Sequence, residues 1–284
     1  MITCNLVGGL GNQLFQIFTT ISYAIKSKEK FIFLNSETIG TGITKVRNTY
    51  WENLLYRLKP FLTVNFQNYI VIRESGFTFN DIISEINYNK INNNTCLYGY
   101  FQSDKYFQNY YETICKMLDI DNQKKTVSKS YSDFNLENTV SMHFRLGDYK
   151  LLPNVYQILT YEYYKKAFEY IINFYKVIEN QNICNLHIWF FCEDNDLEDV
   201  NIIIEQLKLE FPHNFINRAP SSLKDWEQML LMSCCKHNII ANSSFSWWGS
   251  YLNSNPDKIV CYPETWFVNN TDTRDLCPLE WIKI

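Results

Sequence analysis

The pattern of apolar and polar positions over the first 35 residues predicts a strand, a glycine turn, a helix and a second strand. Residues 2–7 form a short strand-like run, and Leu14, Phe15, Phe18, Ile21 and Ile25 then recur at helical spacing. The apolar run 31–34 predicts a buried strand. A strand, a helix and a strand in succession favour a parallel sheet.

The same alternation returns in the second half of the chain. Strands are predicted at 139–144, 186–192 and 237–241, and helices at 161–178, 197–210, 223–236 and 245–253. The run 186–192 is nearly all apolar, as is typical of a strand in the centre of a parallel sheet.

The segment between these halves, residues 36–135, has no clear period, and its polar stretch 121–138 is the candidate domain boundary. We therefore expect an α/β protein with two Rossmann-like domains, 1–135 and 136–284.

Composition narrows the class of protein. Of the 284 residues, 46% are hydrophobic and 20% charged, which is typical of a globular chain. The net charge is -4 and no Lys/Arg stripe is present, so a nucleic-acid partner is not expected. The nine cysteines lack zinc-type spacing and are expected to be reduced and buried. With no apolar run of ~18 residues and no leader-like start, we expect a cytoplasmic protein without a transmembrane segment, at most peripheral to a membrane.

Glycines at 8, 9 and 11 lie between the first predicted strand and helix. Glycine allows the backbone to turn tightly and approach a ligand, and a helix start offers unpaired N–H groups. The spacing is not that of a dinucleotide fingerprint, and no acidic residue ends the next strand. A tight turn that binds nothing explains this segment equally well.

An Arg and an Asp follow the predicted strand 139–144. Ligands of open α/β sheets bind beyond the carboxyl ends of strands, and an Arg there can place two hydrogen bonds on phosphate oxygens. Arg145 and Asp148 can also form a structural ion pair. His143, inside the apolar strand, is more readily a core imidazole than a base or a ligand.

Small polar residues at 242–246 join the strand 237–241 to the next helix. Capping that helix needs only one of them, so the remaining N–H and O–H donors suit a diphosphate. Trp247 and Trp248 can either pack the two domains together or flank a sugar, and packing is favoured.

Together these three segments resemble glycosyltransferase family 11, the α-1,2-fucosyltransferases. Residues 8–16 read Gly-Gly-Leu-Gly-Asn-Gln-Leu-Phe-Gln, residues 143–149 read His-Phe-Arg-Leu-Gly-Asp-Tyr, and residues 239–249 read Ile-Ile-Ala-Asn-Ser-Ser-Phe-Ser-Trp-Trp-Gly, in the family's order. The resemblance implies a GT-B fold, with two Rossmann-like domains facing a central cleft. The N-terminal domain would take the glycan acceptor and the C-terminal domain GDP-fucose. It further implies inverting transfer of fucose to O-2 of galactose, with no metal or other cofactor.

The resemblance also implies roles for particular residues. Arg145 would bind the β-phosphate of the donor, Asp194 the guanine, and Gly11 and Asn12 would approach the donor from the other domain. The Ser-rich turn would face the diphosphate through Ser243, Ser244, Phe245 and Ser246. The family's central motif carries two adjacent Arg residues, and Leu146 stands at the second position here. Any role that rests on the second cation, including the linkage preference, is therefore in doubt.

The acceptor hydroxyl must lose a proton to a nearby group. Asp148 is the first candidate because it follows the same strand as Arg145, ahead of His143 and Asp194. Transfer of the proton to water is the alternative.

Three other interpretations remain open. Residues 194–196 read Asp-Asn-Asp, like the Asp-x-Asp metal clamp of GT-A transferases. Because Leu146 replaces the second Arg of the motif, a protein that binds a nucleotide sugar without transferring it is a second possibility. A transferase that uses another GDP-sugar is chemically close to a fucosyltransferase.

Overall fold

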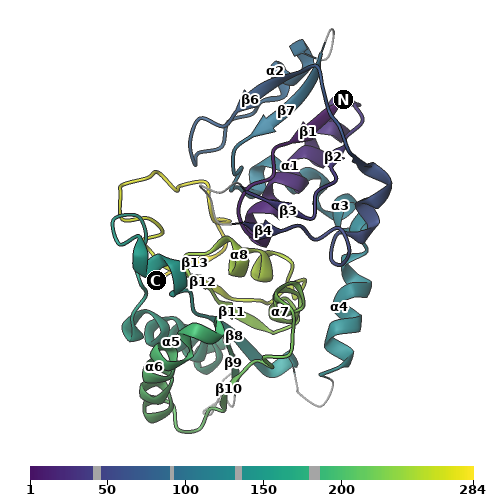
Figure 1. Cartoon of the computed structure of the whole chain (residues 1–284). Helices are drawn as coiled ribbons and strands as arrows, with labels where there is room; N and C mark the ends of the chain where they lie inside the picture. Colours follow the sequence, from purple (N-terminus) through teal and green to yellow (C-terminus); the bar gives the residue numbers. More distant parts are fainter. Residues whose placement is uncertain (41–45, 90–92, 132–135, 179–185) are drawn as a thin grey trace. The chain divides into compact units, whose positions relative to one another are not determined.

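The computed structural model describes residues 1–40, 46–89, 93–131, 136–178 and 186–284, and they form two compact units (Figure 1). Unit 1 is Met1–Gln123 with Asp272–Pro278, and unit 2 is Lys124–Thr271 with Leu279–Ile284. The chain therefore passes from one unit to the other earlier than the expected boundary at 135, and a late segment returns to unit 1. The assignment of acceptor and donor to the two halves stays a prediction.

Unit 1 contains a parallel sheet in the order β1 (Ile2–Cys4), β7 (Asn94–Tyr98), β6 (Tyr69–Arg73). The helix α1 (Leu10–Ser27) follows β1 as expected. The expected strand 31–34 is divided: Phe31 forms a parallel bridge with Ile2 of β1, whereas β2 (Phe33–Leu34) pairs with β5 (Leu62–Thr63). Phe33 is fully buried and Leu34 is 46% exposed. The expected parallel pairing after α1 is therefore present, and only part of the apolar run is buried.

The remaining elements of unit 1 are short, which explains why residues 36–135 show no clear period. They are β3 (Thr38–Ile39), β4 (Arg47–Asn48), η1 (Tyr56–Phe61), α2 (Ile83–Asn89), η2 (Asp104–Tyr106), η3 (Gln108–Tyr110) and α3 (Tyr111–Leu118).

Helix α4 (Ile120–Lys129) occupies much of the polar stretch where a boundary was expected. The unit boundary falls inside this helix. The side chain of Gln123 donates to the carbonyls of Leu54 and Leu118 in unit 1, whereas Lys124 Nζ donates to the carbonyl of Leu252 in unit 2. Because polar side chains make these anchoring contacts, the sequence does not show an apolar stripe there.

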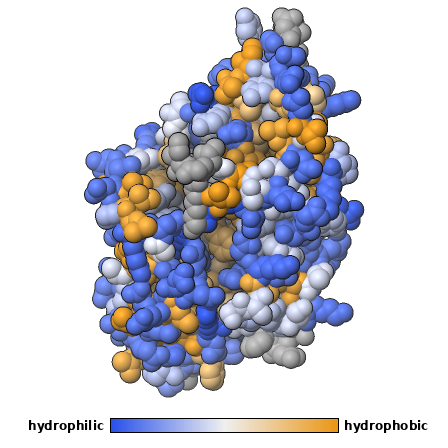
Figure 2. Space-filling view, in the orientation of Figure 1, coloured by the Kyte–Doolittle hydropathy of each residue, from blue (hydrophilic) through white to orange (hydrophobic). Residues whose placement is uncertain are grey.

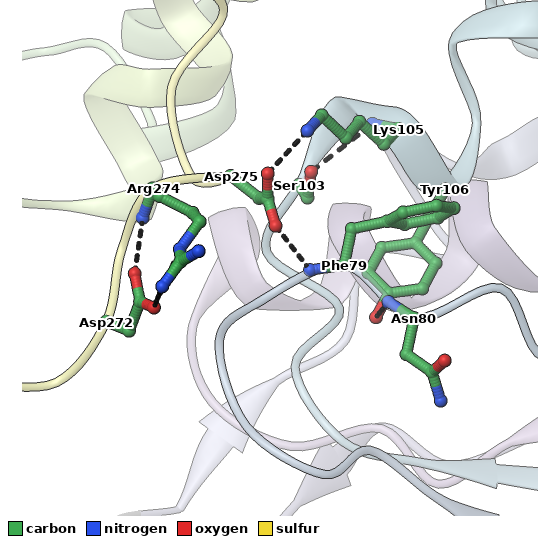
Figure 3. Close-up of polar contacts among 8 residues, drawn as sticks. All are labelled: Phe79, Asn80, Ser103, Lys105, Tyr106, Asp272, Arg274 and Asp275. Atoms are coloured by element: carbon green, nitrogen blue, oxygen red, sulfur yellow. Dashed lines mark hydrogen bonds and ion pairs between the residues drawn. The ribbon is translucent and has the colours of Figure 1, made fainter.

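The late segment Asp272–Pro278 makes polar contacts with unit 1 through the carboxylate of Asp275 (Figure 3), and its Leu276 is buried. Asp275 accepts a hydrogen bond of 2.9 Å from the backbone N–H of Phe79 and forms an ion pair with Lys105. Asp272 and Arg274 pair with each other within the segment. Asp275 is therefore the contact that joins this segment to the 79 and 105 regions of unit 1.

The described part of unit 2 forms a six-stranded parallel sheet in the order β10-β9-β8-β11-β12-β13. The strands are β8 (Thr139–His143), β9 (His187–Phe191), β10 (Ile216–Arg218), β11 (His237–Ile239), β12 (Val260–Tyr262) and β13 (Ile282–Lys283). The predicted strands 139–144, 186–192 and 237–241 are confirmed. The strand order reverses between β8 and β11.

Four helices cover this sheet (Figure 1): α5 (Tyr161–Ile178), α6 (Leu197–Glu210), α7 (Asp225–Met232) and α8 (Ser244–Tyr251). Helices α5 and α6 share a core with Val140 and Met142 of β8. Side chains alternate along a strand, so Ser141 lies on the opposite face, where Asn238 donates both to its hydroxyl and to the Met232 carbonyl of α7.

Both tryptophans of the third motif are buried within unit 2. The ring of Trp247 lies on that of Tyr251, with centroids 4.6 Å apart and an interplanar angle of 15°, and 5.4 Å from that of Trp281. Trp248 is also fully buried. Both rings therefore pack within unit 2, and the expected packing between the two domains stays a prediction.

The α/β class and the parallel sheets expected of a GT-B-type protein are confirmed in both units. Hydrophilic residues predominate on the face seen in Figure 2, and apolar residues form scattered groups there. In the part of the chain that the structure describes, every helix is too short or too polar to cross a membrane. Within the same residues all cysteines are free thiols, and five of them are buried.

Candidate functional site

The predicted site residues of unit 2 follow three neighbouring strands of its sheet. His143 ends β8 and Arg145 follows it, Asp194 comes after β9, and residues 243–246 come after β11. Because the strands are parallel, their carboxyl ends meet at one edge of the sheet. The reversal of strand order between β8 and β11 also lies there, and open α/β sheets bind ligands at such a point.

Arg145 lies among carboxylates at this edge. Its side chain is 16% exposed, and its Nη1 and Nη2 atoms pair with Glu193 and Asp148, respectively. Burial lowers the pKa of the guanidinium, but the two carboxylates outweigh burial and the net pKa is raised. Arg145 is thus held as a cation, and its two terminal nitrogens make the contacts that phosphate oxygens also make. The ion pair between Arg145 and Asp148 that the sequence left open is present.

The loop that carries Arg145 is fixed by Asp196. Both carboxylate oxygens of this buried residue accept the N–H of Gly147, at 3.0 and 2.8 Å. Gly147 has a φ of +26°, and a Cβ atom there would lie 3.2 Å from Glu193 Oε2. Glycine at this position therefore admits both the backbone conformation and the close approach of Glu193.

The two aspartates of residues 194–196 have different partners. Asp194 has a side chain that is 78% exposed and pairs with Arg218, at the end of β10. Asp196 is buried against Gly147. This arrangement does not fit a two-carboxylate metal clamp. Within the described residues, no three His, Cys, Asp or Glu side chains form a group that could hold a metal ion.

His143 is buried beneath the site. Burial, with the nearby Arg145 cation, lowers its pKa to about 3, so the imidazole is neutral at physiological pH. Its ring centroid lies 5.5 Å from that of Phe245. Among the described residues Nδ1 has no hydrogen-bond partner. This environment is that of a core imidazole, and the role of His143 as a base stays a prediction.

The Ser-rich turn uses two of its hydroxyls internally. Ser243 caps α8 by accepting the N–H of Phe245, and the buried hydroxyl of Ser246 donates to the Ala241 carbonyl. Ser244 and Phe245 are only half-buried. The N–H groups of the first turn of α8, which begins at the half-buried Ser244, are therefore the donors best suited to a phosphate.

The first motif lies in unit 1. Gly8 has a φ of +83°, and a Cβ atom on it would lie 2.4 Å from Asn12 Nδ2. Asn12 Oδ1 accepts a hydrogen bond of 2.8 Å from Gln102 Nε2, and Gly11 is buried in the first turn of α1. Gly8 is thus the glycine that the turn requires. The approach of Gly11 and Asn12 to a donor stays a prediction.

Leu146 is buried in the apolar core of unit 2, together with Phe144 and Tyr164. The position at which the family's pattern has a second Arg therefore contributes packing here and no charge.

Three residues at this edge were not assigned a role from the sequence: Glu193, Tyr149 and Arg218. Asp196 was considered there only as part of an Asp-x-Asp metal clamp. Glu193 and Asp196 lie close to Asp194, just after a predicted strand. The sequence therefore indicated that they lie near the site, but not that they contact Arg145 and Gly147. Tyr149 closes the central motif. Arg218 ends a strand too short to be read from its apolar pattern.

Comparison with known proteins identifies the family to which this chain belongs. The family model described as Glycosyl transferase family 11 matches residues 1–284. The O-antigen biosynthesis glycosyltransferase WbnK of Escherichia coli is 27% identical, covering 100% of this chain and 100% of that protein. An alpha-1,2-colitosyltransferase of Escherichia coli is 25% identical, covering 100% of this chain and 99% of that protein. A solved structure of Arabidopsis thaliana FUT1, a mutant in complex with GDP, has a TM-score of 0.47 and 11% identity, covering 93% of this chain and 71% of that one.

The fold, the site and the match over the whole chain define a glycosyltransferase. The chain belongs to glycosyl transferase family 11.

Proposed function

We propose that this glycosyltransferase moves fucose, with inversion and without a metal ion, from GDP-fucose to a sugar hydroxyl, most specifically O-2 of galactose. One observation carries the proposal: Arg145 and the start of α8 follow the two strands that flank the switch point of unit 2. A cation and a helix N-terminus at that point suit a diphosphate.

The chemistry explains why these groups matter. The acceptor oxygen forms a bond to the anomeric carbon while the bond from that carbon to the diphosphate oxygen breaks. The electron pair of the broken bond stays on GDP, so negative charge develops on the leaving diphosphate. Arg145 and the N–H groups near Ser244 are oriented before the reaction, and each such donor typically stabilises the transition state by about 3–4 kcal/mol.

The donor would replace an internal partner of Arg145. Glu193 is the more exchangeable of the two carboxylates, because its side chain is 47% exposed and that of Asp148 is 34% exposed. With Glu193 displaced, Asp148 would keep its contact with Nη2. Asp148 thus remains our candidate for accepting the proton of the acceptor hydroxyl, with water as the alternative.

Metal-independent transfer is part of the same proposal. Asp194 pairs with Arg218 and Asp196 with Gly147, so the positive charge is supplied by Arg145 and the helix start. Activity should persist when a chelator is added. Activity that is lost with a chelator and restored by manganese would instead favour the Asp-x-Asp interpretation.

A second donor is favoured by one finding. A relative over the whole chain is named as a colitosyltransferase, which supports a transferase for another GDP-activated sugar. Competition between GDP-fucose, GDP-mannose and other GDP-sugars in the same assay separates these donors. GDP binding with no transfer to a broad acceptor panel would select a binding protein without turnover, which the apolar Leu146 first suggested.

We expect Arg145→Ala to lower the rate of fucose transfer from GDP-fucose to a galactoside by at least ~10²-fold. The substitution removes a hydrogen-bonding cation that stabilises the negative charge developing on the diphosphate. Product formation by chromatography measures this. Arg57→Ala is the matched control, because it removes a 53% exposed guanidinium from unit 1 that pairs with Asp119. Equal activities of the two variants would contradict the role of Arg145.

A further inference from the structure

Tyr149 lies where the loop after β8 meets the turn after β11. It belongs to the short helix η5 (Gly147–Leu151) that follows Arg145. Its hydroxyl donates a hydrogen bond of 2.9 Å to the backbone carbonyl of Asn242. One phenol group thus connects the Arg145 loop to the start of the Ser-rich turn.

The turn that Tyr149 contacts is itself fixed. Asn242 is fully buried, and its side-chain amide donates to the carbonyls of Gln157 and Trp266. The Ser243 hydroxyl accepts the N–H of Phe245 and so caps α8. The Tyr149 hydroxyl therefore binds a rigid part of the turn, two residues before Ser244.

The ring of Tyr149 contacts the cation directly. The Arg145 guanidinium carbon lies 5.3 Å from the ring centroid, within the range of a cation–π contact. The ring of Tyr156 stacks on Tyr149 with centroids 3.8 Å apart and an interplanar angle of 9°. The stacked ring restricts rotation of Tyr149, so the position of the phenol sets the position of the guanidinium.

We infer that Tyr149 is a positioning residue: it fixes the distance between Arg145 and the Ser244 turn, so that both act together on one diphosphate. The inference rests on the proposed function and deepens it. Burial raises the pKa of Tyr149, so its hydroxyl keeps the proton that it donates to Asn242.

Tyr149→Phe removes the hydroxyl and keeps the stacked ring, so it tests the hydrogen bond to the Asn242 carbonyl alone. We expect kcat with GDP-fucose to fall at least ~10-fold, because small misplacements of positioned groups are costly in the transition state. The KM for GDP-fucose should change less than about threefold, since full charge on the leaving group appears only as the bond breaks.

Tyr163→Phe is the matched control. The Tyr163 hydroxyl is also buried and also donates to a backbone carbonyl beyond β11, that of Ile240, but it comes from helix α5 and not from the loop that carries Arg145. Both variants should lose similar thermal stability, whereas only Tyr149→Phe should lose kcat. Equal kcat values in the two variants would overturn the inference.

A GDP-binding experiment tests the connection between Arg145 and the Ser244 turn without measuring catalysis. Arg145→Lys keeps the charge and loses the planar fork, and Ser244→Ala removes a hydroxyl. In a double-mutant cycle of GDP affinity, measured by calorimetry, we expect the two changes to be coupled by at least about threefold in the wild-type background and to become additive in Tyr149→Phe. Coupling that persists in Tyr149→Phe would overturn the inference.

Two further arms keep the outcomes distinct. If Tyr149→Phe folds poorly, Tyr156→Leu provides a second test, because it keeps the Tyr149 hydroxyl and removes the ring stacked on Tyr149. This variant should also lower kcat and the coupling between Arg145→Lys and Ser244→Ala. A wild-type chain that neither binds GDP nor transfers fucose contradicts the proposed function itself, and this inference with it. A fully active wild-type chain with an unimpaired Tyr149→Phe variant contradicts the inference alone.

Discussion

Single buried residues already determine how this protein responds to pH. His237 of β11 is fully buried and uses both ring nitrogens: Nδ1 accepts the N–H of Ile259 at 2.9 Å, and Nε2 lies 2.7 Å from the Tyr175 hydroxyl. Because Nδ1 accepts, the proton of the neutral ring belongs on Nε2. Burial, with a smaller effect of Lys236, lowers the pKa of His237 to about 3. Protonation would disrupt the bond to Ile259.

The consequence is a loss of stability in acid. Between pH 6.5, the ordinary pKa, and about pH 3, His237 is protonated only in the unfolded chain, so the unfolded state binds more protons there. The contribution of His237 to the free energy of unfolding is therefore at its full value above pH 6.5. Between pH 6.5 and about pH 3 it falls by up to about 1.4 kcal/mol per pH unit as the pH drops. His237→Gln should reduce the pH slope of the unfolding free energy by about one proton, as urea unfolding at pH 4–6 measures. An unchanged slope in His237→Gln would contradict the assignment.

At the scale of elements, the late segment Asp272–Pro278 shows how few contacts join distant parts of the chain. Asp275 is the residue through which it binds both the Phe79 N–H and Lys105 (Figure 3). Asp272, three residues earlier, pairs only locally with Arg274. The two aspartates are therefore a natural pair for comparison.

We expect Asp275→Ala to destabilise the attachment of this segment by about 1–3 kcal/mol, because a half-buried N–H and an ammonium group lose their charged partner. Hydrogen exchange should then increase at the Phe79 amide and across 272–278. Asp272→Ala should leave the Phe79 amide protected. Equal exchange in both variants would show that Asp275 does not hold the segment.

At the scale of the whole molecule, the charged groups proposed for the donor belong to unit 2. The candidates in unit 1, Gly11 and Asn12, contribute a buried backbone and an amide that pairs with Gln102. Binding of a nucleotide diphosphate should therefore stabilise the edge of the unit 2 sheet first.

Saturating GDP should slow hydrogen exchange at residues 143–149 and 242–246, and Arg145→Ala should abolish this protection. At a GDP concentration of 100 times the dissociation constant, the stabilisation is about 2.7 kcal/mol. Mass spectrometry of peptides from both units provides the measurement. Protection confined to residues 8–12 would place the diphosphate in unit 1 and contradict the site.

Sequence patterns predicted the long elements well and the short ones poorly. Helix α5 (Tyr161–Ile178) and strand β9 (His187–Phe191) have enough residues to show a period. Strands of two residues, such as β2 (Phe33–Leu34), do not, and α4 (Ile120–Lys129) is anchored by polar side chains that an apolar pattern misses. At the site, motifs predicted Arg145 but not its partner Glu193, which lies 48 residues away along the chain.

By itself, the sequence determined the alternation of strands and helices in unit 2 and the order of the three motifs, since both depend on local spacing. Only the tertiary structure decided that Gly147 meets Asp196 and that Tyr149 meets Asn242. Those contacts arise because β9 and β11 lie on either side of β8, and strand order depends on how the whole sheet packs rather than on any one segment.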